Sequence, residues 1–346
     1  MLSQRLFAFF ALFMVIPIGQ FEFDDFFKEK IAFKPQPVSI SPKDDAYHGP
    51  YHIPTTEWWY FDAIFENGYA IHTGISVHSV EDQGVMRYVV EIYKDGKLLE
   101  RSSMVTIFLP SLVSKDYPCI RIGDKVIMYL DLKTFRENGK WKYKLYIRIG
   151  KTVVDLIYVG TTVGWKCCTE REGWVVPLPK ALVYGRLTLG NENLEVYGTG
   201  YHDHNWNYSV LTGIDSKGWY WGRIGGKRLS LTWAEIRNRW ENDTKIATLN
   251  FDSDGYIGID QENISILTLD FINVDGLEIP TKIIILVDDN KVHASITLVV
   301  TDYHPINLFI LRYCRLFVKV YGYVSTGSIK EEFRGELQIA ESMNFI

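Results

Sequence analysis

The chain has 346 residues, 47% of them apolar and 14% aromatic, which is enough to bury a large core in one large or two medium domains. Its formal net charge of −5 gives no basic footprint, so we expect no nucleic-acid partner. The abundant aromatic residues suit β-strands, and they also suit the walls of a pocket for an apolar ligand.

The N-terminal stretch "MLSQRLFAFFALFMVIPIGQ" places one arginine ahead of an apolar run from Leu6 to Ile18. This run is shorter than the roughly 20 residues that span a bilayer, and it resembles the apolar core of a secretory signal. We expect residues 1–19 to be a signal peptide or, alternatively, an uncleaved anchor that associates with a membrane surface. The protein is then exported, to the extracellular space, the cell surface or the periplasm. Residues 20–44 mix charge and proline and predict an extended arm.

From about Trp58 onward, the chain reads almost entirely as β-strands. Segments such as "YAIHTGISVHSV", "KYKLYIRIG" and "HASITLVV" alternate apolar and polar residues, and turn signals such as Glu66-Asn67-Gly68 separate them. No helical period runs for three turns. The pattern gives roughly fourteen to sixteen strands, more than one small barrel holds. We therefore predict an all-β protein with two barrel-like domains, residues 45–208 and 209–346.

Export would permit disulfides, and the chain has four cysteines. Cys167 and Cys168 are adjacent and cannot easily bridge each other. The natural pairing is therefore Cys119 with one of these two.

The stretch "GYHDHNWN", residues 200–207, concentrates titratable groups in one strand. Strand alternation puts His202, His204 and Trp206 on one face and Asp203 on the other. Three interpretations stay open: an acid/base site, a hydrogen-bonded knot that joins the domains, or a metal site. The histidine spacing could serve zinc, but no third ligand is placed by spacing. We predict no metal and no cofactor.

Aromatic and titratable residues also share strands elsewhere, which is typical of an apolar pocket that holds a few polar groups. Plain core packing is the alternative for "EWWY", and a structural role is the alternative for His72. An ion pair with Arg237 or Arg223 is the alternative role of Glu235. The residues concerned are Glu57, Trp58, Trp59 and Tyr60 in "EWWY", Trp221 in "WYWGRI", Trp233 and Glu235 in "LTWAEIR", and His72 in an earlier strand.

The blocks "EWWY" at 57–60, "GYHDHNWN" at 200–207 and "WYWGRI" at 219–224 resemble the signature blocks of the AttH/carotenoid-hydratase family. That family includes hydroxyneurosporene-synthase-like enzymes, and fungal Diels–Alderases are distant relatives. The resemblance runs from about residue 45 to the end of the chain. It implies two lipocalin-like (calycin-type) antiparallel β-barrels packed side by side, with a site for an apolar ligand at or near their junction.

The resemblance also implies roles for particular residues. The histidine and tryptophan of the hydratases fall on His204 and Trp206, and their strand pair falls on Trp233 and Glu235. The chain departs from the family pattern at Asn207, where a small glycine is expected, and in "TWAE", where Tyr-x-Asp is expected.

In such a site, burial would keep Glu235 protonated, so that it could donate a proton to an isolated double bond. Aromatic faces would stabilise the resulting carbocation, and His204 could hold or deprotonate the attacking water. Asp203 is a further catalytic candidate. The expected ligand-binding residues are Trp206, Trp233, Glu57, Trp58, Trp59, Tyr60, Trp221 and His72.

Two functions therefore compete. One is an enzyme that hydrates, cyclises or isomerises an isoprenoid-like or other apolar substrate. The other is a carrier that binds a lipid-like or other hydrophobic small molecule without chemistry. A secreted hydrolase is disfavoured, because neither a Gly-x-Ser-x-Gly elbow nor a complete zinc motif occurs in the sequence.

Overall fold

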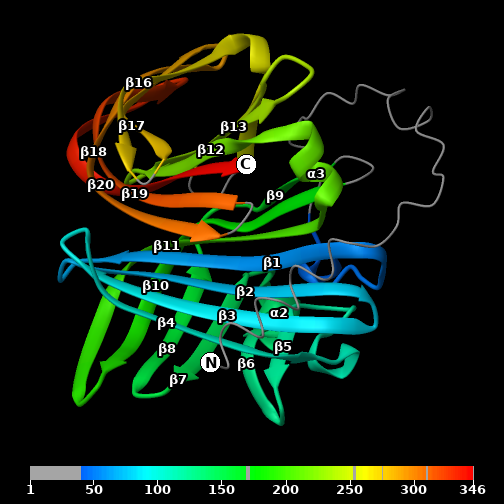
Figure 1. Cartoon of the computed structure of the whole chain (residues 1–346). Coiled ribbons are helices and arrows are strands. Elements are labelled where there is room, and N and C mark those ends of the chain that lie inside the picture. Colours follow the sequence, from blue (N-terminus) through cyan, green and yellow to red (C-terminus); the bar gives the residue numbers. More distant parts are fainter. Residues whose placement is uncertain (1–39, 169–171, 252–254, 275, 309–310, 346) are drawn as a thin grey trace.

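The computed structural model describes residues 40–168, 172–251, 255–274, 276–308 and 311–345 (Figure 1). The predicted signal peptide or anchor, residues 1–19, lies outside the described residues, as do residues 20–39 of the predicted arm. Within the described ranges, no helix is both long enough and apolar enough to cross a membrane.

Two antiparallel sheets make up the molecule, one above the other in Figure 1. The strands of the first sheet are β1 (Tyr51–Phe65), β2 (Tyr69–Glu81), β3 (Gln83–Lys94), β4 (Lys97–Phe108), β5 (Cys119–Ile122), β6 (Lys125–Leu130), β7 (Lys142–Ile149), β8 (Thr152–Gly160), β9 (Trp165–Cys168), β10 (Gly173–Leu189) and β11 (Glu192–Ser209). Their order is β4-β3-β2-β1-β11-β10-β8-β7-β6-β5, and β9 pairs with β10 outside this row.

The second sheet follows in the chain. Its strands are β12 (Ser216–Gly225), β13 (Leu229–Asn238), β14 (Thr244–Phe251), β15 (Gly255–Ile259), β16 (Ile264–Val274), β17 (Leu277–Asp288), β18 (Val292–Leu308), β19 (Leu311–Thr326) and β20 (Ile329–Phe345). Their order is β15-β14-β13-β12-β20-β19-β18-β17-β16.

Short helical segments connect the strands. They are the 3₁₀ turns η2 (Pro42–Asp45), η3 (Pro110–Leu112) and η4 (Gln261–Asn263) and the α-helices α2 (Leu132–Asn138) and α3 (Val210–Asp215). Asp131 caps α2 by accepting a hydrogen bond from the Thr134 amide, and Gly139 ends it with φ of 70°. Helix α3 joins the two sheets. Ser209 caps it by accepting from the Leu211 amide.

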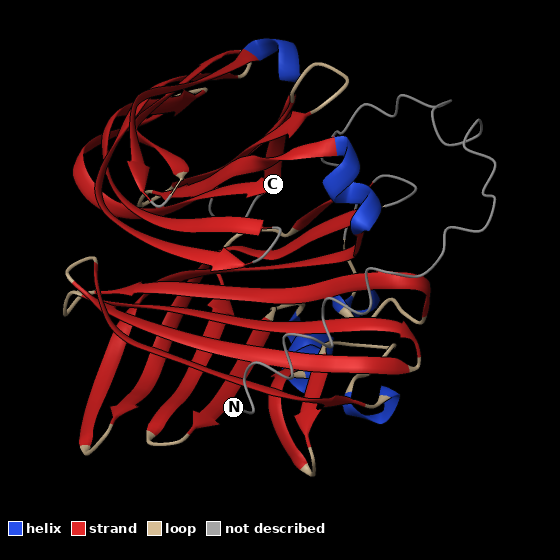
Figure 2. Ribbon diagram, viewed as in Figure 1, coloured by secondary structure: helices blue, strands red, loops and turns tan. Residues whose placement is uncertain are grey.

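Each sheet curls strongly, as Figure 2 shows. Each encloses its own apolar core, so the predicted all-β fold of two antiparallel barrels is confirmed in the form of two half-barrels. Strand alternation builds these cores. On β7, Tyr143, Leu145 and Ile147 point inward and are fully buried, while Lys144 is exposed. Burying each such apolar side chain contributes about 1.5–3 kcal/mol.

The predicted disulfide is wrong, because Cys119 is a free, buried cysteine. Sheet order gives the reason. Cys119 lies on β5 at one end of the first sheet, whereas Cys167 lies on β9 beside β10, and strands β6, β7 and β8 separate the two. Cys314 of the second sheet is also free and buried.

Candidate functional site

Strand β11 divides the titratable groups of "GYHDHNWN" between two environments. His202, His204 and Trp206 point into the first half-barrel, and Asp203 points to the junction with the second sheet. This is the division that alternation predicts. Strand β1 is the direct neighbour of β11, and the pairing places Trp59 opposite His204 and Tyr60 opposite Asp203.

Inside the first half-barrel, His204 lies between two carboxylates. Its Nε2 is 2.8 Å from Glu57 Oε1, and its Nδ1 is 3.3 Å from Asp45 Oδ1, outside hydrogen-bond geometry. All three side chains are fully buried. Trp59 stacks on the imidazole with ring centroids 4.3 Å apart, which fixes the plane of the ring. The predicted pairing of Glu57 and Trp59 on one strand face therefore places both at His204.

The carboxylates control the protonation of this group. Burial alone would lower the pKa of His204, but the two facing carboxylates, Asp45 and Glu57, raise it to about 9. Burial would raise the pKa of Asp45, but the neighbouring His202 and His204 lower it to about 2. The pKa of Glu57 is likewise lowered, against its burial, by His204 and His48. Without any other cation, His204 is an imidazolium held by two anions.

Asp45 is fixed by its own partners. His202 Nε2 lies 3.1 Å from Asp45 Oδ2, and the Tyr143 hydroxyl donates to the same oxygen at 2.6 Å. The Trp59 indole N–H donates to the Asp45 main-chain oxygen at 3.0 Å. The carboxylate was missed in the sequence, because "PKDD" reads as polar loop and nothing local shows that its last residue enters the barrel.

His48 lies at the solvent-exposed edge of this cluster. Its main-chain N–H donates to Glu57 Oε1 at 3.0 Å, and its side chain is 25% exposed. The imidazole stacks on Trp206 with centroids 3.8 Å apart and planes 2° from parallel. Gly173 lies opposite Trp206 on β10, and a Cβ there would be 2.0 Å from the indole, so glycine makes room for this stack. His48 was also missed, since a lone histidine before Gly-Pro carries no pattern.

The residue after Trp206 explains one departure from the family pattern. Asn207 has φ of 65°, in the left-handed region that favours glycine, and asparagine is one of the few other residues that tolerate it. A glycine would adopt this backbone conformation freely, so the asparagine found here is compatible with the expected glycine.

His48, Glu57 and His204 also form a possible ligand set for a cation. One ligand atom from each, two imidazole nitrogens and a carboxylate oxygen, all lie within 4.8 Å of one another.

At the junction, the pairing of β1 with β11 sets side chains in three rows, and each row meets a side chain of β12 from the second sheet. The first row holds Trp58, Asn205 and Trp219, the second holds Tyr60, Asp203 and Trp221, and the third holds Asp62, Tyr201 and Arg223. The rows run from half-buried to buried: Trp58 and Trp219 are half-buried, while Asp62 and Tyr201 are fully buried. The third row is closed by Arg223, whose Nε donates to Asp62 Oδ1 at 2.8 Å.

Asp203 is the titratable group of the second row. Its Oδ2 accepts from Trp174 Nε1 at 3.0 Å and from the Tyr201 hydroxyl at 2.9 Å, and Asn205 Nδ2 contacts Oδ1 at 3.1 Å. These partners are all neutral. Burial therefore dominates and raises the pKa of Asp203 to about 8, although the Tyr201 and Trp174 hydrogen bonds lower it. At neutral pH, Asp203 is a protonated carboxylic acid among indole and phenol rings.

His72 and Tyr60 belong to a second polar network at the junction. His72 Nδ1 lies 2.9 Å from Glu91 Oε2, and the Tyr60 hydroxyl accepts from Arg315 Nη1 at 3.0 Å. Arg315 Nη2 also lies 3.1 Å from Glu341 Oε1. Burial and the nearby Arg315 lower the pKa of His72 to about 4, so this imidazole is neutral. The partner of the His72 imidazole is the Glu91 carboxylate. His72 lies on β2, whereas the aromatic rows are formed by β1, β11 and β12.

Trp233 and Glu235 lie on β13, in the second half-barrel. Trp233 is fully buried in the core of the second half-barrel, and Glu235 shares its face of β13, while Ala234 between them faces the junction. The structure therefore does not bring Glu235 to His204, which lies inside the other half-barrel. Burial raises the pKa of Glu235, and Asp243 adds to this, whereas Lys245 and Arg237 oppose it. Arg223, one of its expected partners, binds Asp62 instead.

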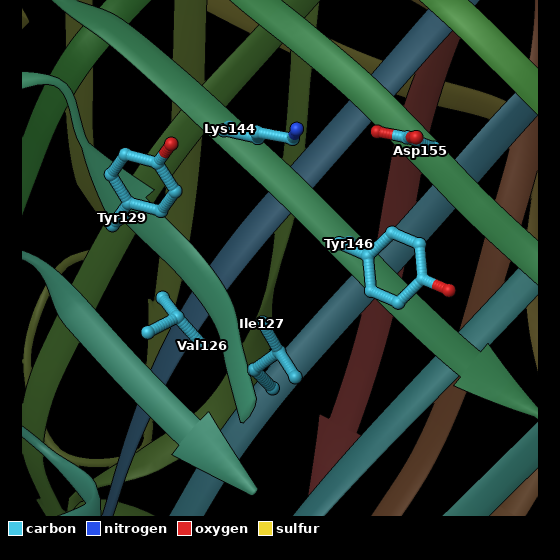
Figure 3. A pocket seen from close by; sticks show the side chains of 6 residues that line it. All are labelled: Val126, Ile127, Tyr129, Lys144, Tyr146 and Asp155. Carbon is cyan, nitrogen blue, oxygen red and sulfur yellow. The ribbon is translucent and has the colours of Figure 1, made fainter. Parts of the chain in front are cut away.

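A separate pocket of about 280 Å³ opens on the first sheet, where β6 diverges from β7 (Figure 3). None of the site residues expected from the sequence lines it. The lining residues are Val126, Ile127, Tyr129, Lys144, Tyr146 and Asp155.

The comparisons with known proteins bear on the fold. No protein-family model matches the chain, and neither does any curated protein. Among solved structures, the chain is similar to a candidate AttH (NE1406) from Nitrosomonas europaea, with a TM-score of 0.67 and 13% identity over 96% of this chain and 99% of that one.

Two further structures are similar. Kievitone hydratase from Nectria haematococca has a TM-score of 0.57 and 13% identity, over 91% of this chain and 98% of that one. CghA in complex with Sch210972 has a TM-score of 0.59 and 12% identity, over 85% of this chain and 89% of that one. The AttH-like fold that the three motifs implied is confirmed over nearly the full chain, and at these identities the likeness establishes the fold.

Proposed function

We propose that this chain binds an apolar, unsaturated small molecule at the first row of the junction and that Asp203 donates a proton to a double bond of that molecule. The observation that carries the proposal is the position of Asp203, a buried carboxyl with neutral partners, directly beneath a half-buried aromatic row. The finding that a protein named as a hydratase shares the fold supports this chemistry.

The first row supports an apolar ligand. The indoles of Trp58 and Trp219 come from different sheets and lie within 9° of parallel, with centroids 6.4 Å apart. The ring of Tyr208 packs against both indoles, with its centroid 4.5 Å from that of Trp58 and 6.1 Å from that of Trp219. Half-buried indole and phenol rings keep accessible apolar surface against which an apolar ligand can pack.

The second row supports acid chemistry. A neutral carboxylic acid is required to protonate an alkene, and Asp203 is neutral at physiological pH because it is buried without a cationic partner. Protonation forms a new C–H bond and leaves a carbocation and the Asp203 carboxylate. The faces of Trp58 and Trp221 stabilise the cation, by about 2 kcal/mol for a desolvated contact. Water that adds to the cation releases a proton, which restores Asp203, and the product is an alcohol.

This assignment differs from the one expected from the family pattern, in which Glu235 is the acid and His204 holds the water. Asp203 takes the place of Glu235 because its carboxyl faces the aromatic rows, whereas Glu235 faces the interior of the second half-barrel.

The test uses the purified full chain incubated with a lipid extract, and bound small molecules are identified by mass spectrometry. We expect a bound apolar compound and a product heavier by one water molecule. In Asp203→Asn the compound should bind without conversion. In Trp58→Ala and Trp219→Ala binding should weaken by about 1–3 kcal/mol each. Trp240→Ala is the matched control, because Trp240 is 73% exposed outside the junction and its loss should leave affinity unchanged.

Three outcomes decide between the possible functions. Equal affinity in Trp58→Ala, Trp219→Ala and wild type would place the ligand elsewhere. Recovery of the same unaltered compound from wild type and Asp203→Asn would make the protein a carrier without chemistry. Conversion that persists in Asp203→Asn but disappears in Glu235→Gln would return the acid role to Glu235.

A further inference from the structure

Three buried polar atoms around His204 have no hydrogen-bond partner among the described residues. They are Asp45 Oδ1, His48 Nδ1 and His204 Nδ1. Asp45 Oδ1 and His204 Nδ1 face each other at 3.3 Å as an ion pair, so His48 Nδ1 is the atom that most needs an explanation. A buried polar atom without a partner costs about 1–3 kcal/mol. Two of the three belong to histidines whose rings also reach Glu57, at 3.6 Å from His48 Nδ1 and 2.8 Å from His204 Nε2.

We propose that His48, Glu57 and His204 bind a divalent transition-metal ion, for which Zn²⁺ is the first probe, through His48 Nδ1, Glu57 Oε1 and His204 Nε2. Two imidazoles and one carboxylate form a ligand set that zinc and ferrous iron both accept. The sequence pointed to His202 and His204 as a zinc pair and placed no third ligand by spacing. Of these two only His204 belongs to the proposed set, because His202 Nε2 faces Asp45 Oδ2. His48 lies on a loop before β1 that the fold brings over β11.

The distances fit a cation after a small adjustment. Ligand atoms bound at about 2.0–2.2 Å from one metal lie about 3.3 Å apart in tetrahedral geometry. The two contacts to Glu57 are 2.8 Å and 3.6 Å, on either side of that value. The third separation, between the two imidazole nitrogens, is within 4.8 Å, and the half-buried His48 ring is the ligand with room to close any remaining difference.

The surrounding residues form the outer shell that metal ligands require. A metal on His204 Nε2 leaves the ring proton on Nδ1, which faces Asp45 Oδ1 at 3.3 Å, the arrangement of a carboxylate–histidine–metal triad. The second oxygen of Glu57 accepts from the Tyr51 hydroxyl at 2.6 Å. Metal binding therefore gives His48 Nδ1 a partner and leaves the contact between His204 Nδ1 and Asp45 Oδ1 as it is. Three protein ligands would leave the fourth position of a tetrahedral site open, as in catalytic rather than structural zinc sites.

This site is independent of the proposed ligand site, because it lies inside the first half-barrel on the opposite face of β11. The experiment therefore measures binding alone. The full chain is treated with a chelator, desalted and titrated with Zn²⁺ in competition with a chromophoric chelator. Co²⁺, whose visible absorption reports the ligand geometry, is titrated in parallel. We expect one equivalent of either metal to bind and the melting temperature to rise with added Zn²⁺.

His48→Ala should weaken Zn²⁺ binding by more than tenfold, and Asp45→Asn by about 10–100-fold through the outer shell. His48 is partly exposed, so its variant should keep the fold, as circular dichroism without metal will check. The matched control is His52→Ala, because His52 lies four residues later, is 88% exposed and contacts only Glu81 among the interactions described. Its affinity should equal that of wild type.

Absence of a stoichiometric site in the wild type would overturn the proposal, and the cluster would then be a hydrogen-bonded ion triad centred on protonated His204. Binding that survives in His48→Ala, or that falls equally in His52→Ala, would also overturn it, because the metal would then use other ligands. Failure of the junction ligand assay leaves this result unaffected, so the two proposals fail separately.

Discussion

Asp203 and His204 are consecutive residues of β11, yet their side chains meet opposite electrostatic environments. The Asp203 carboxyl faces the junction among neutral donors, and His204 faces the first half-barrel between two carboxylates. The acid is thereby kept protonated and the base is kept charged, with pKa values of about 8 and about 9. One strand thus carries two separate centres, because its side chains alternate between two half-barrels.

The raised pKa of Asp203 predicts a pH-dependent stability. The unfolded side chain ionises near the ordinary aspartate pKa of 3.8, while the folded one stays protonated up to about 8. The contribution of Asp203 is therefore fully present below about pH 4 and is lost as the pH rises through 8. Compared with Asp203→Asn, the wild type should lose unfolding free energy, on the order of a few kcal/mol, between these pH values. Chemical denaturation of both proteins across this range measures the difference. Parallel curves for the two proteins would show that Asp203 is ionised in the fold.

The sequence could predict the faces of the strands but not the partners across space. Alternation in "EWWY" and "GYHDHNWN" correctly separated Glu57 and Trp59 from Trp58 and Tyr60, and His204 from Asp203, since each strand obeys a period of two. The same rule placed Trp233 and Glu235 together. It could not say which of the two half-barrel interiors a given face enters. The family pattern joined His204 to Glu235 in one site, and the structure places the two side chains in different half-barrels.

Asp45 and His48 show that residues outside regular strands could not be assigned to the site from the sequence. Both act at the centre of the His204 cluster, but they lie in a short 3₁₀ turn and the loop after it, where no periodicity exists. Their position depends on how the chain before β1 packs over the barrel, which is a tertiary contact. The number of strands was also underestimated: the described residues contain β1 to β20, and several short strands such as β5, β9 and β15 carry too few residues for a clear alternation.

His72 predicts a loss of stability in acid. Its folded pKa is about 4, whereas the ordinary histidine pKa is 6.5, because burial and Arg315 disfavour the charged ring. The neutral ring therefore contributes stability above about pH 6.5 that is lost as the pH falls through 4. His72→Gln, which cannot titrate, should show a shallower fall in unfolding free energy between pH 6.5 and 4. His52→Gln is the control, because His52 is 88% exposed, and its slope should match that of wild type.

The ion pair between Asp62 and Arg223 links the two sheets and predicts strong coupling. Both side chains are buried, and Arg223 Nε contacts both carboxylate oxygens, at 2.8 Å and 3.1 Å. Removing one partner leaves an uncompensated buried charge, so Asp62→Ala and Arg223→Ala should each cost about 3–5 kcal/mol. The double variant should cost clearly less than the sum of the two single variants. A double-mutant cycle in urea measures the coupling free energy between Asp62 and Arg223. Additive losses of unfolding free energy would show that the pair contributes no coupling.

Gly173 predicts how tightly the mouth of the first half-barrel is packed. A Cβ on this residue would lie 2.0 Å from the Trp206 ring, which itself stacks on His48. Gly173→Ala should therefore displace the indole, lower the unfolding free energy by about 1–3 kcal/mol and shift the tryptophan fluorescence. The matched control is Gly213→Ala in α3, where the nearest atom to a new Cβ is Phe345 Cδ1 at an ordinary 3.5 Å. That change should be neutral or slightly stabilising, because alanine favours helix.

Because Trp206 packs against His48, Gly173→Ala should also weaken Zn²⁺ binding if His48 is a ligand, whereas Gly213→Ala should not. Unchanged stability in Gly173→Ala would mean that Trp206 can move freely and does not hold His48 in place.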